Sequence, residues 1–451
     1  MKMNRRRFLA SSTAAFGFQV VASHVLRAVP GAATPNGKIR IAAIGCGGQG
    51  GADLNGMQAE DIVALCDVDD RRAAKSFAKF PGAKRFKDFR VMFDQMADQI
   101  DAVLVATPDH THRVAAMAAI SRGKHVYCEK PLAHSIGDVR ALREAALRHK
   151  VITQVGNQGH SSESIRVFCE LVWAGAVGNV TEVHAGCGEF KNIYCQIGQH
   201  ADLLAGKEPV PKELDWDLWL GPAKERPYHP AYLPFNWRGF ADFGCGCLGD
   251  WVCHVLDPIF WAADLDLPTA ITAETVGWDP KKDRGYFPKG SRITYEFPAK
   301  GKRPALKIIW HDGEFTIPQP PELGAERKVV RTGAVIRGDA GVMMHGSHGA
   351  GGVRILPEER HREFVAKGVE KKIERVKGGH QADWLNAIRA GGQAGSSFEY
   401  GGALTEVGLL GVIALQFPGQ RLEWDAKAMK FTNHDAANAF VAPMARKGWE
   451  A

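Results

Sequence analysis

A glycine-rich turn directly after an apolar run is the feature that most constrains this fold. Residues 41–50 read IAAIGCGGQG, which gives Gly45, Gly47 and Gly50 the spacing G-x-G-x-x-G. The residues before Gly45 predict a buried parallel strand, and those from Gly50 onward predict a helix. A second apolar run, 62–66, ends in Asp67, at about the distance where dinucleotide-binding folds carry an acidic residue. Together these features predict a dinucleotide-binding unit rather than some other glycine-rich turn.

Each residue of the turn has an expected role. Gly45 permits the tight bend, Gly47 lets the backbone approach a pyrophosphate, and Gly50 lets the helix pack closely on the strand. The first residues of the helix, with Gly48 and Gln49, offer amide groups and positive potential to the phosphates. We therefore expect all five residues to bind the cofactor.

The charge of Asp67 bears on the kind of cofactor. Its carboxylate is expected to accept hydrogen bonds from the adenosine ribose, and it would repel the 2′-phosphate of NADP. Arg71 and Arg72 follow closely and could offset that repulsion. The sequence therefore favours NAD, with NADP as the less favoured alternative.

The first third of the chain alternates predicted strands with predicted helices. Strands are expected at 39–44, 62–66, 100–106, 125–128 and 151–155, and helices from residue 50 and at 70–80, 86–96, 113–122 and 136–149. This alternation is typical of a Rossmann-type, doubly wound parallel sheet, here placed at residues 38–155 with a boundary near Gly156.

The remaining residues, 156–451, read differently. Strands are expected at 180–186, 270–276, 291–297 and 305–310, and helices after residue 157 and at 381–390 and 405–416. The glycine-rich segment 333–352 is expected to be a loop. Since 451 residues exceed one compact core, we predict a second domain, with a predominantly antiparallel open sheet and helices on one face.

The N-terminus resembles a twin-arginine (Tat) export signal. Residues 4–9 read NRRRFL and precede a modestly apolar stretch that runs to about residue 26. That stretch is too polar to predict a membrane span, so residues 1–33 are expected to be a signal peptide and linker. A basic arm or an uncleaved anchor is the alternative. The expectation is a periplasmic or otherwise exported protein that meets the Tat machinery and has no stable membrane span after maturation.

Charge and cysteine content narrow the remaining classes. The net charge is +7, but no long Lys/Arg block follows the N-terminus, so nucleic-acid binding is not indicated. Nine cysteines cannot all pair within one chain, and the pair Cys245 and Cys247 lacks a metal-binding spacing. We expect no metal site and no disulfide framework.

Several motifs together resemble the Gfo/Idh/MocA oxidoreductase family. The glycine turn and Glu129-Lys130-Pro131 carry the resemblance, supported by ATPDHTH at 106–112, GNQ at 156–158 and GCLGDWVCHVLD at 246–257. It covers about residues 38–450, and the Trp-rich second half looks like an exported subgroup. The resemblance implies action on sugars, sugar acids or glycosides. It also implies possible pairing into dimers or tetramers through the open sheet.

The reaction that the resemblance implies is oxidation of a secondary alcohol. Lys130 would be the cation near the developing alkoxide, and His254 the general base. Asp250 lies four residues before His254, on the same helix face, and would orient His254 or a substrate hydroxyl. The alternatives are a surface lysine and a core histidine.

Further contacts are expected on both sides of this centre. Cofactor contacts are assigned to Thr107, Pro108, His110, His112, Glu129, Lys130 and Asn157. Substrate contacts are assigned to Gln158, His160, Tyr228, Trp237, Arg238, Asp250 and His254. Packing is an equal alternative for the aromatic residues.

Three functions follow from these expectations. The first is an NAD-dependent sugar or glycoside oxidoreductase that holds its cofactor tightly, because an exported protein meets no cofactor pool. The second is a redox-neutral glycoside hydrolase or lyase that works through a 3-keto intermediate, with Tyr228, His229 or His160 as the elimination base. The third, a non-catalytic binding protein, is disfavoured by the intact motifs.

Overall fold

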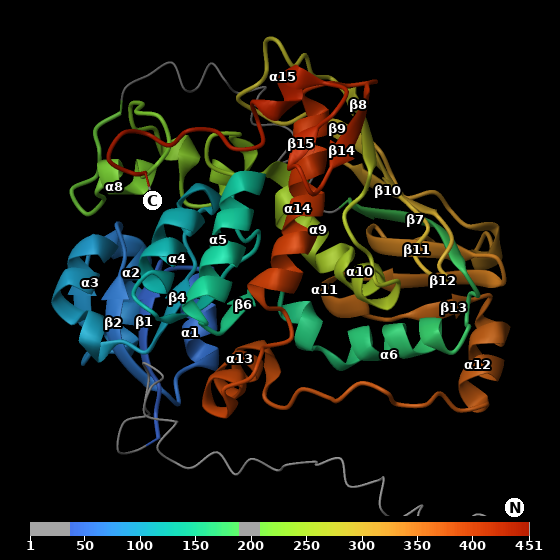
Figure 1. Cartoon of the computed structure of the whole chain (residues 1–451), viewed down its shortest axis with the longest axis horizontal. Coiled ribbons are helices and arrows are strands. Elements are labelled where there is room, and N and C mark those ends of the chain that lie inside the picture. Colours follow the sequence, from blue (N-terminus) through green and yellow to red (C-terminus); the bar gives the residue numbers. More distant parts are fainter. Residues whose placement is uncertain (1–36, 189–207, 451) are drawn as a thin grey trace, which may run out of the picture.

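A parallel six-stranded sheet forms the first lobe (Figure 1). The computed structural model describes residues 37–188 and 208–450. The strand order is β3-β2-β1-β4-β5-β6, so the chain winds outward on one side of β1 and then on the other. The strands are β1 (Arg40–Ile44), β2 (Asp61–Cys66), β3 (Lys84–Phe86), β4 (Ala102–Val105), β5 (His125–Cys128) and β6 (Thr153–Val155). In such sheets ligands bind where the winding reverses, at the carboxyl ends of β1 and β4.

The helices of this lobe lie close to their predicted positions. They are α1 (Gln49–Gly56), α2 (Asp70–Lys79), α3 (Phe89–Met96), α4 (His112–Ile120) and α5 (Ile136–His149). The predicted start of α3 at residue 86 is wrong, because Phe86 belongs to the short strand β3 and pairs with Cys66. Asp88 then caps α3 by accepting a hydrogen bond from the Arg90 amide.

A helix from the far end of the chain covers part of the first sheet. It is α13 (Gly379–Ala390), whose Trp384 is fully buried and packs edge-on to Tyr127 of β5. Trp384 and Leu385 share an apolar cluster with Ile41 and Leu104 of the central strands. Helix α13 follows the predicted domain boundary at residue 156 in the sequence, but it packs against the first lobe in space (Figure 1).

The second lobe is built on a nine-stranded sheet with the order β13-β12-β11-β7-β10-β9-β8-β14-β15. Its pairs are antiparallel except for β7 with β10, which run parallel. The strands are β7 (Val180–Cys187), β8 (Ala270–Val276), β9 (Gly290–Phe297), β10 (Leu306–Asp312), β11 (Thr332–Gly338), β12 (Gly341–Gly346), β13 (Arg354–Leu356), β14 (Arg421–Asp425) and β15 (Lys430–Phe431).

Helices cover one face of this sheet, as predicted. They are α6 (Glu163–Trp173), α9 (Gly246–Val255), α10 (Asp257–Ala262) and α14 (Phe398–Leu415). The remaining helices are α8 (Trp216–Leu220), α11 (Ser347–Ala350), α12 (Glu358–Ala366) and α15 (Asp435–Asn438).

The prediction of a loop at 333–352 is wrong. Strands β11 and β12 form an antiparallel hairpin there, with Gly333 opposite Gly346 and Arg337 opposite Val342. A Cβ atom on Gly333 would lie 2.1 Å from the His345 carbonyl oxygen, so the glycine permits close approach of the two strands. High glycine content here reflects strand packing rather than a flexible connection.

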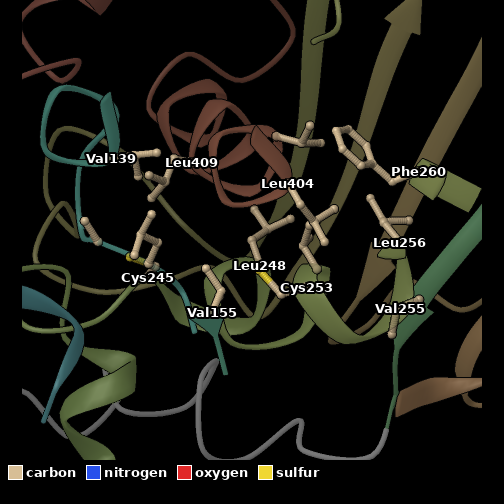
Figure 2. Packing of buried hydrophobic residues seen from close by; sticks show 14 of the residues in the cluster. Val139, Val155, Cys245, Leu248, Cys253, Val255, Leu256, Phe260, Leu404 and Leu409 are labelled. Atoms are coloured by element: carbon tan, nitrogen blue, oxygen red, sulfur yellow. The ribbon is translucent and has the colours of Figure 1, made fainter. Parts of the chain in front are cut away.

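Helix α14 joins the cores of the two lobes. Leu404 and Leu409 of α14 lie near Val139 of α5 and Leu248 of α9 (Figure 2). Within the described ranges, α14 alone is long and apolar enough to cross a membrane, but 78% of that stretch is buried inside the protein. A helix that is apolar on all sides is expected at such a central position.

Candidate active site

A cleft of about 510 Å³ lies at the carboxyl ends of β1, β2, β4 and β5, between the two lobes. Fourteen of the predicted site residues line it together. From the first lobe these are Gly45, Gly47, Gly48, Gln49, Asp67, Thr107, Pro108, Glu129 and Lys130, and from beyond residue 156 they are Gln158, Trp237, Arg238, Asp250 and His254. The fold thus brings residues from seven separate segments of the sequence to one cavity.

The glycine turn forms a backbone cradle at one end of the cleft. Gly45 has φ 83° and Gly48 has φ 54°, a conformation that suits glycine. Gly48 is the N-cap of α1 and no side chain caps the helix. A Cβ atom on Gly47 would lie 2.8 Å from the Arg72 carbonyl oxygen. The uncapped helix end and the bare backbone fit a pyrophosphate group.

Gly50 lies behind the cradle and does not line it. A Cβ atom there would lie 2.0 Å from the Gly45 carbonyl oxygen. Gly50 therefore sets how closely α1 approaches β1, the packing role predicted for it.

Asp67 holds the glycine turn in place. Its Oδ2 accepts hydrogen bonds from the amides of Cys46 (2.8 Å) and Gly47 (3.3 Å), and its Oδ1 accepts one from Asp69 (3.0 Å). Burial raises the pKa of Asp67, opposed by these hydrogen bonds. Asp69 and Arg72 also line the cleft, and Arg71 forms an ion pair with Asp69. Contact of Asp67 with a ribose stays a prediction.

Lys130, Asp250 and Arg238 form a charged chain across the cleft. The Lys130 ammonium donates a hydrogen bond to Oδ1 of Asp250, and the Arg238 Nε lies 3.4 Å from Oδ2. Burial lowers the pKa of Lys130, but the Asp250 carboxylate outweighs this effect and the pKa is raised overall. Lys130 is consequently held as a cation, and Asp250 touches Lys130 and Arg238.

His254 lies on the same helix face one turn after Asp250. Its side chain is buried, and its Nδ1 finds no hydrogen-bond partner among the residues of the described ranges. Burial, together with the Lys130 charge, holds the pKa of His254 well below its usual value. The imidazole is therefore neutral near pH 7 and can accept a proton.

At the cleft wall, the lining residue Glu129 lies beside a second buried carboxyl group, Asp53. Glu129 accepts a hydrogen bond from the Gln158 amide (2.7 Å), and Asp53 accepts from Gln49 and Gln381 (3.0 Å each). Burial raises the pKa of Asp53 to about 6, and burial and Asp53 raise that of Glu129 well above its usual value. This network fixes Gln49 and Gln158 at the cleft wall.

Two family models match the chain. One, described as an oxidoreductase family with an NAD-binding Rossmann fold, matches residues 39–157. The other, its C-terminal alpha/beta domain, matches residues 169–300. The chain belongs to the Gfo/Idh/MocA oxidoreductase family. Both the cradle and the Lys130 segment lie within the first match.

Individual relatives of this family show similarity over a limited span. Inositol 2-dehydrogenase of Rubrobacter xylanophilus is 33% identical over 147 residues, covering 31% of this chain and 41% of that protein. A glycosyl hydrolase family 109 protein of Solibacter usitatus is 32% identical over 167 residues, covering 34% and 37%. The chain thus spans less than half the length of these curated relatives.

A solved structure shows the same fold over a longer span. The WlbA dehydrogenase of Bordetella pertussis, in complex with NADH and UDP-GlcNAcA, has a TM-score of 0.60 at 17% identity. The superposition covers 86% of this chain and 99% of that one. This agreement shows that the two proteins share one overall fold.

Besides Gly50, three predicted cofactor contacts lie outside the cleft lining. His110 faces the carbonyls of Phe243 (3.2 Å) and Trp219 (3.0 Å), and His112 those of Pro131 (2.8 Å) and Thr107 (2.7 Å). Burial lowers the pKa of His110 to about 3 and that of His112 to about 4. Asn157 is fully buried and donates to Asp257 (3.1 Å). The structure gives these three residues a supporting position behind the cleft.

Two predicted substrate contacts also pack elsewhere. His160 lies 2.9 Å from Oδ1 of Asp257 and stacks on Trp261. Tyr228 packs edge-on to Trp216 in an aromatic cluster. Neither lines the cleft.

Sequence reasoning missed other lining residues, among them Asp69, Asp109, His348 and Trp449. Asp109 lies in the ATPDHTH motif, which could have identified it. His348 lies in the segment that was predicted to be a loop, and Trp449 lies near the C-terminus. No sequence motif surrounds either residue, so neither could be assigned to the site. Within the described ranges, no group of three or more His, Cys, Asp or Glu side chains is arranged to hold a metal ion.

Proposed function

We propose that this protein is an NAD-dependent oxidoreductase acting on a secondary hydroxyl of a sugar, sugar derivative or glycoside. The observation that carries the proposal is the shared cleft. A charged Lys130 and a neutral His254 line the same cavity as the glycine cradle. Bound NAD would supply a nicotinamide ring that accepts a hydride from the substrate carbon.

The side chains divide the remaining work. His254 takes the hydroxyl proton, since its neutral imidazole has an unused nitrogen. Lys130 stabilises the negative charge that develops on the oxygen, and Asp250 holds the lysine charged and in position. Trp237 and Arg238 line the same part of the cleft and offer an aromatic surface and a cation to the substrate.

We propose NAD rather than NADP because the cleft wall beside the glycine cradle carries negatively charged side chains. Asp67 and Asp69 line it together with Arg72, while Arg71 is paired with Asp69. The carboxylates would repel a 2′-phosphate, and Arg72 and Lys87 are lining cations that could offset them. We expect the affinity for NADP to be lower than that for NAD.

The depressed pKa of His254 gives a pH prediction. An ordinary histidine would lose its base form as the pH falls through about 6.5. Since burial and Lys130 keep His254 neutral well below that value, substrate oxidation in a single turnover should stay nearly constant between about pH 8 and about pH 6. Stopped-flow absorbance of the reduced nicotinamide measures this rate, and a tenfold fall over that range would contradict the assigned base.

We also propose that the cofactor is tightly held, because segments from outside the first lobe close the cradle end of the cleft. The Asp70 amide donates to the Glu213 carbonyl (3.2 Å), and the Asp215 amide donates to Val68 (2.9 Å). These contacts bring the segment that leads into α8 onto the turn between β2 and α2. Leu218 and Trp219 of α8 line the cleft.

The C-terminal residues 442–450 complete this cover, and Figure 1 shows them running back beside α8. Arg446 donates through Nε to the Gly221 carbonyl (3.0 Å). Trp449 is buried, lines the cleft and receives the Arg90 guanidinium 4.4 Å from its ring centroid. The tail therefore bridges α3 and α8.

Replacing Trp449 by alanine should speed release of bound NADH roughly tenfold, the scale of a lost base–aromatic contact. Dilution into excess NAD, followed by nicotinamide fluorescence, measures the release rate. Trp173→Ala removes an indole from α6 and serves as the matched control, since Trp173 does not line the cleft. Equal release rates in both variants would show that the tail does not retain the cofactor.

Export is proposed from the N-terminal motif. Residues 1–36 lie outside the described ranges, so the proposal rests on NRRRFL at positions 4–9 and the apolar stretch after it. The twin-arginine route carries folded proteins, which suits a protein that would leave with its cofactor enclosed. Replacing Arg5, Arg6 and Arg7 by lysine should trap the protein in the cytoplasm, as measured by cell fractionation.

One experiment tests the proposed function directly. Protein purified from its natural compartment is denatured and the released dinucleotide is identified. The folded protein is then mixed with a panel of sugars and glycosides, without added NAD. Reduction of the bound cofactor and a keto product in stoichiometric yield support oxidation. Absence of both dinucleotide and turnover would overturn the proposal.

A redox-neutral glycoside hydrolase or lyase is the second candidate. It is favoured by the similarity to the glycosyl hydrolase family 109 protein and by the cover over the cofactor. The three elimination bases suggested by sequence, His160, Tyr228 and His229, do not line the cleft. Cleavage of a glycoside in the same assay, without net reduction of the cofactor, would select this candidate.

A further inference from the structure

A second histidine lies against His254 in the cleft. His348 of α11 stacks on the His254 ring with a centroid distance of 4.2 Å and an interplanar angle of 22°. Trp251 meets both rings edge-on, at 5.9 Å and 5.5 Å. Both histidines line the cleft beside Lys130 and Asp250. His348 lies 94 positions after His254 in the sequence, so the fold has brought the pair together.

The backbone that carries His348 is strained. His348 (φ 53°, ψ 55°), Gly349 (φ 84°) and Ala350 (φ 61°) are left-handed in succession. A left-handed conformation costs about 1–2 kcal/mol for a residue with a Cβ atom, and histidine adopts it less readily than glycine. Strain of this kind is concentrated at functional sites.

Neighbouring residues hold this turn in place. The Ser164 hydroxyl donates to the Gly349 carbonyl (2.6 Å), and the Gly346 amide donates to Gly351 (2.7 Å). A Cβ atom on Gly349 would lie 2.1 Å from the Gly159 carbonyl oxygen, which shows how closely the turn packs. The Ser347 hydroxyl lies 2.9 Å from Nδ1 of His348 and fixes the ring. The turn is thus built to present an imidazole to the cleft.

The surroundings leave this imidazole neutral. Burial and the Lys130 charge lower the pKa of His348, while Asp250 opposes them. A neutral imidazole has one nitrogen that donates a hydrogen bond and one that accepts a hydrogen bond, and both bonds lie in the plane of the ring. Two stacked rings can therefore direct two hydrogen bonds side by side, separated by about the ring spacing. Adjacent hydroxyl groups on a sugar ring present two oxygens somewhat closer together than the two imidazole rings, so the two hydrogen bonds would converge on such a pair.

We propose that His348 binds the hydroxyl group adjacent to the one that His254 deprotonates, so that the cleft selects substrates with a vicinal diol. The inference rests on the proposed oxidation, because His254 defines which hydroxyl reacts. His348 acts as a specificity-determining residue. The substrate class is narrowed to sugars with free hydroxyl groups on two neighbouring carbons.

The test compares a glycoside with its own deoxy analogues. A methyl glycoside that reduces the bound NAD is assayed beside the analogues that lack one hydroxyl next to the oxidised carbon, with wild-type protein and His348→Ala. Wild type should prefer the parent roughly tenfold in kcat/KM over one analogue, the scale of a lost hydrogen bond. In His348→Ala that preference should disappear, because the parent glycoside loses about tenfold more in kcat/KM than the analogue does.

Two further variants separate binding from structure. His348→Asn tolerates the left-handed backbone and keeps a hydrogen-bonding group, so it should restore part of the preference. His348→Gly relieves the strain and should have a Tm equal to or above that of wild type. His149→Ala, at an exposed site on α5, is the control and should retain the full preference.

The outcomes distinguish this inference from the proposed function. If His348→Ala slows parent and analogue equally, or if His348→Gly lowers Tm by several degrees, His348 supports structure and the inference is overturned while the oxidation stands. If no sugar reduces the bound NAD in wild type, the proposed function fails and this inference fails with it.

Discussion

Lys130→Ala is expected to reduce substrate oxidation by about 10²–10³-fold, the scale of removing one preorganised group that stabilises developing charge. The ammonium is buried against Asp250 and faces the same cavity as His254. With alanine at this position, the substrate alkoxide has no lysine ammonium beside it. Asp250 keeps Arg238 as a nearby positive partner. Single-turnover reduction of bound NAD measures the loss.

Affinity for NAD should change much less in this variant. The cradle formed by Gly45, Gly47 and Gly48 lies at the other end of the cleft, and its backbone does not depend on the Lys130 side chain. We expect a dissociation constant within about threefold of wild type, because the cradle keeps its contacts with the cofactor. Lys75→Ala, at an exposed site on α2, is the matched control. Oxidation by Lys130→Ala within tenfold of wild type would remove Lys130 from the proposed chemistry.

Gly50→Ala is expected to weaken NAD binding by roughly 100-fold, since overpacking costs about 1–3 kcal/mol and each 1.4 kcal/mol is tenfold. The added Cβ atom would lie 2.0 Å from the Gly45 carbonyl oxygen and 3.1 Å from the Ala106 Cβ. Backbone atoms cannot rotate away, so α1 must move off β1 and the cradle must open. Titration of NADH fluorescence measures the affinity, and circular dichroism verifies that the variant is folded.

Gly51→Ala is the matched control for this prediction. It adds the same atom at the next position of α1, where the nearest neighbour is the Cys46 carbonyl at 3.2 Å. Its affinity for NAD should fall several times less than that of Gly50→Ala. Equal affinities in the two variants would show that the close approach at Gly50 does not shape the cofactor site.

The sequence predicted best those parts of the fold that local patterns determine. Helix α5 begins and ends at its predicted residues, because Ser135 caps it by accepting from the Asp138 amide and its apolar residues repeat on one face. Strand β8 also has its predicted bounds. The G-x-G-x-x-G turn and Lys130 occupy the strand ends at which they were placed, because the order of a doubly wound sheet follows from the alternation of its elements.

The parts that local patterns do not determine were missed. Strands β11 and β12 were obscured by glycines that are needed for contact with neighbouring strands. His348 stacks on His254, although the two residues are 94 positions apart in the sequence. Asp53 and Glu129 are likewise brought together only by tertiary packing. Such pairs have no signature within a sequence window. His110 and His112 were placed at the cofactor because their motif is near it, whereas their ring nitrogens face backbone carbonyls.

The position of α13 has a consequence for the order in which the protein matures. Tyr127 packs against Trp384 of this late helix, and Trp384 shares one apolar cluster with Leu54 of α1 and Phe77 of α2 on the same face of the sheet. A nascent chain that ends before residue 379 leaves the part of that face under α13 exposed, so the first lobe is not a complete domain without this helix. We therefore expect the first lobe to reach its final packing, and to enclose its cofactor, only after α13 has been synthesised.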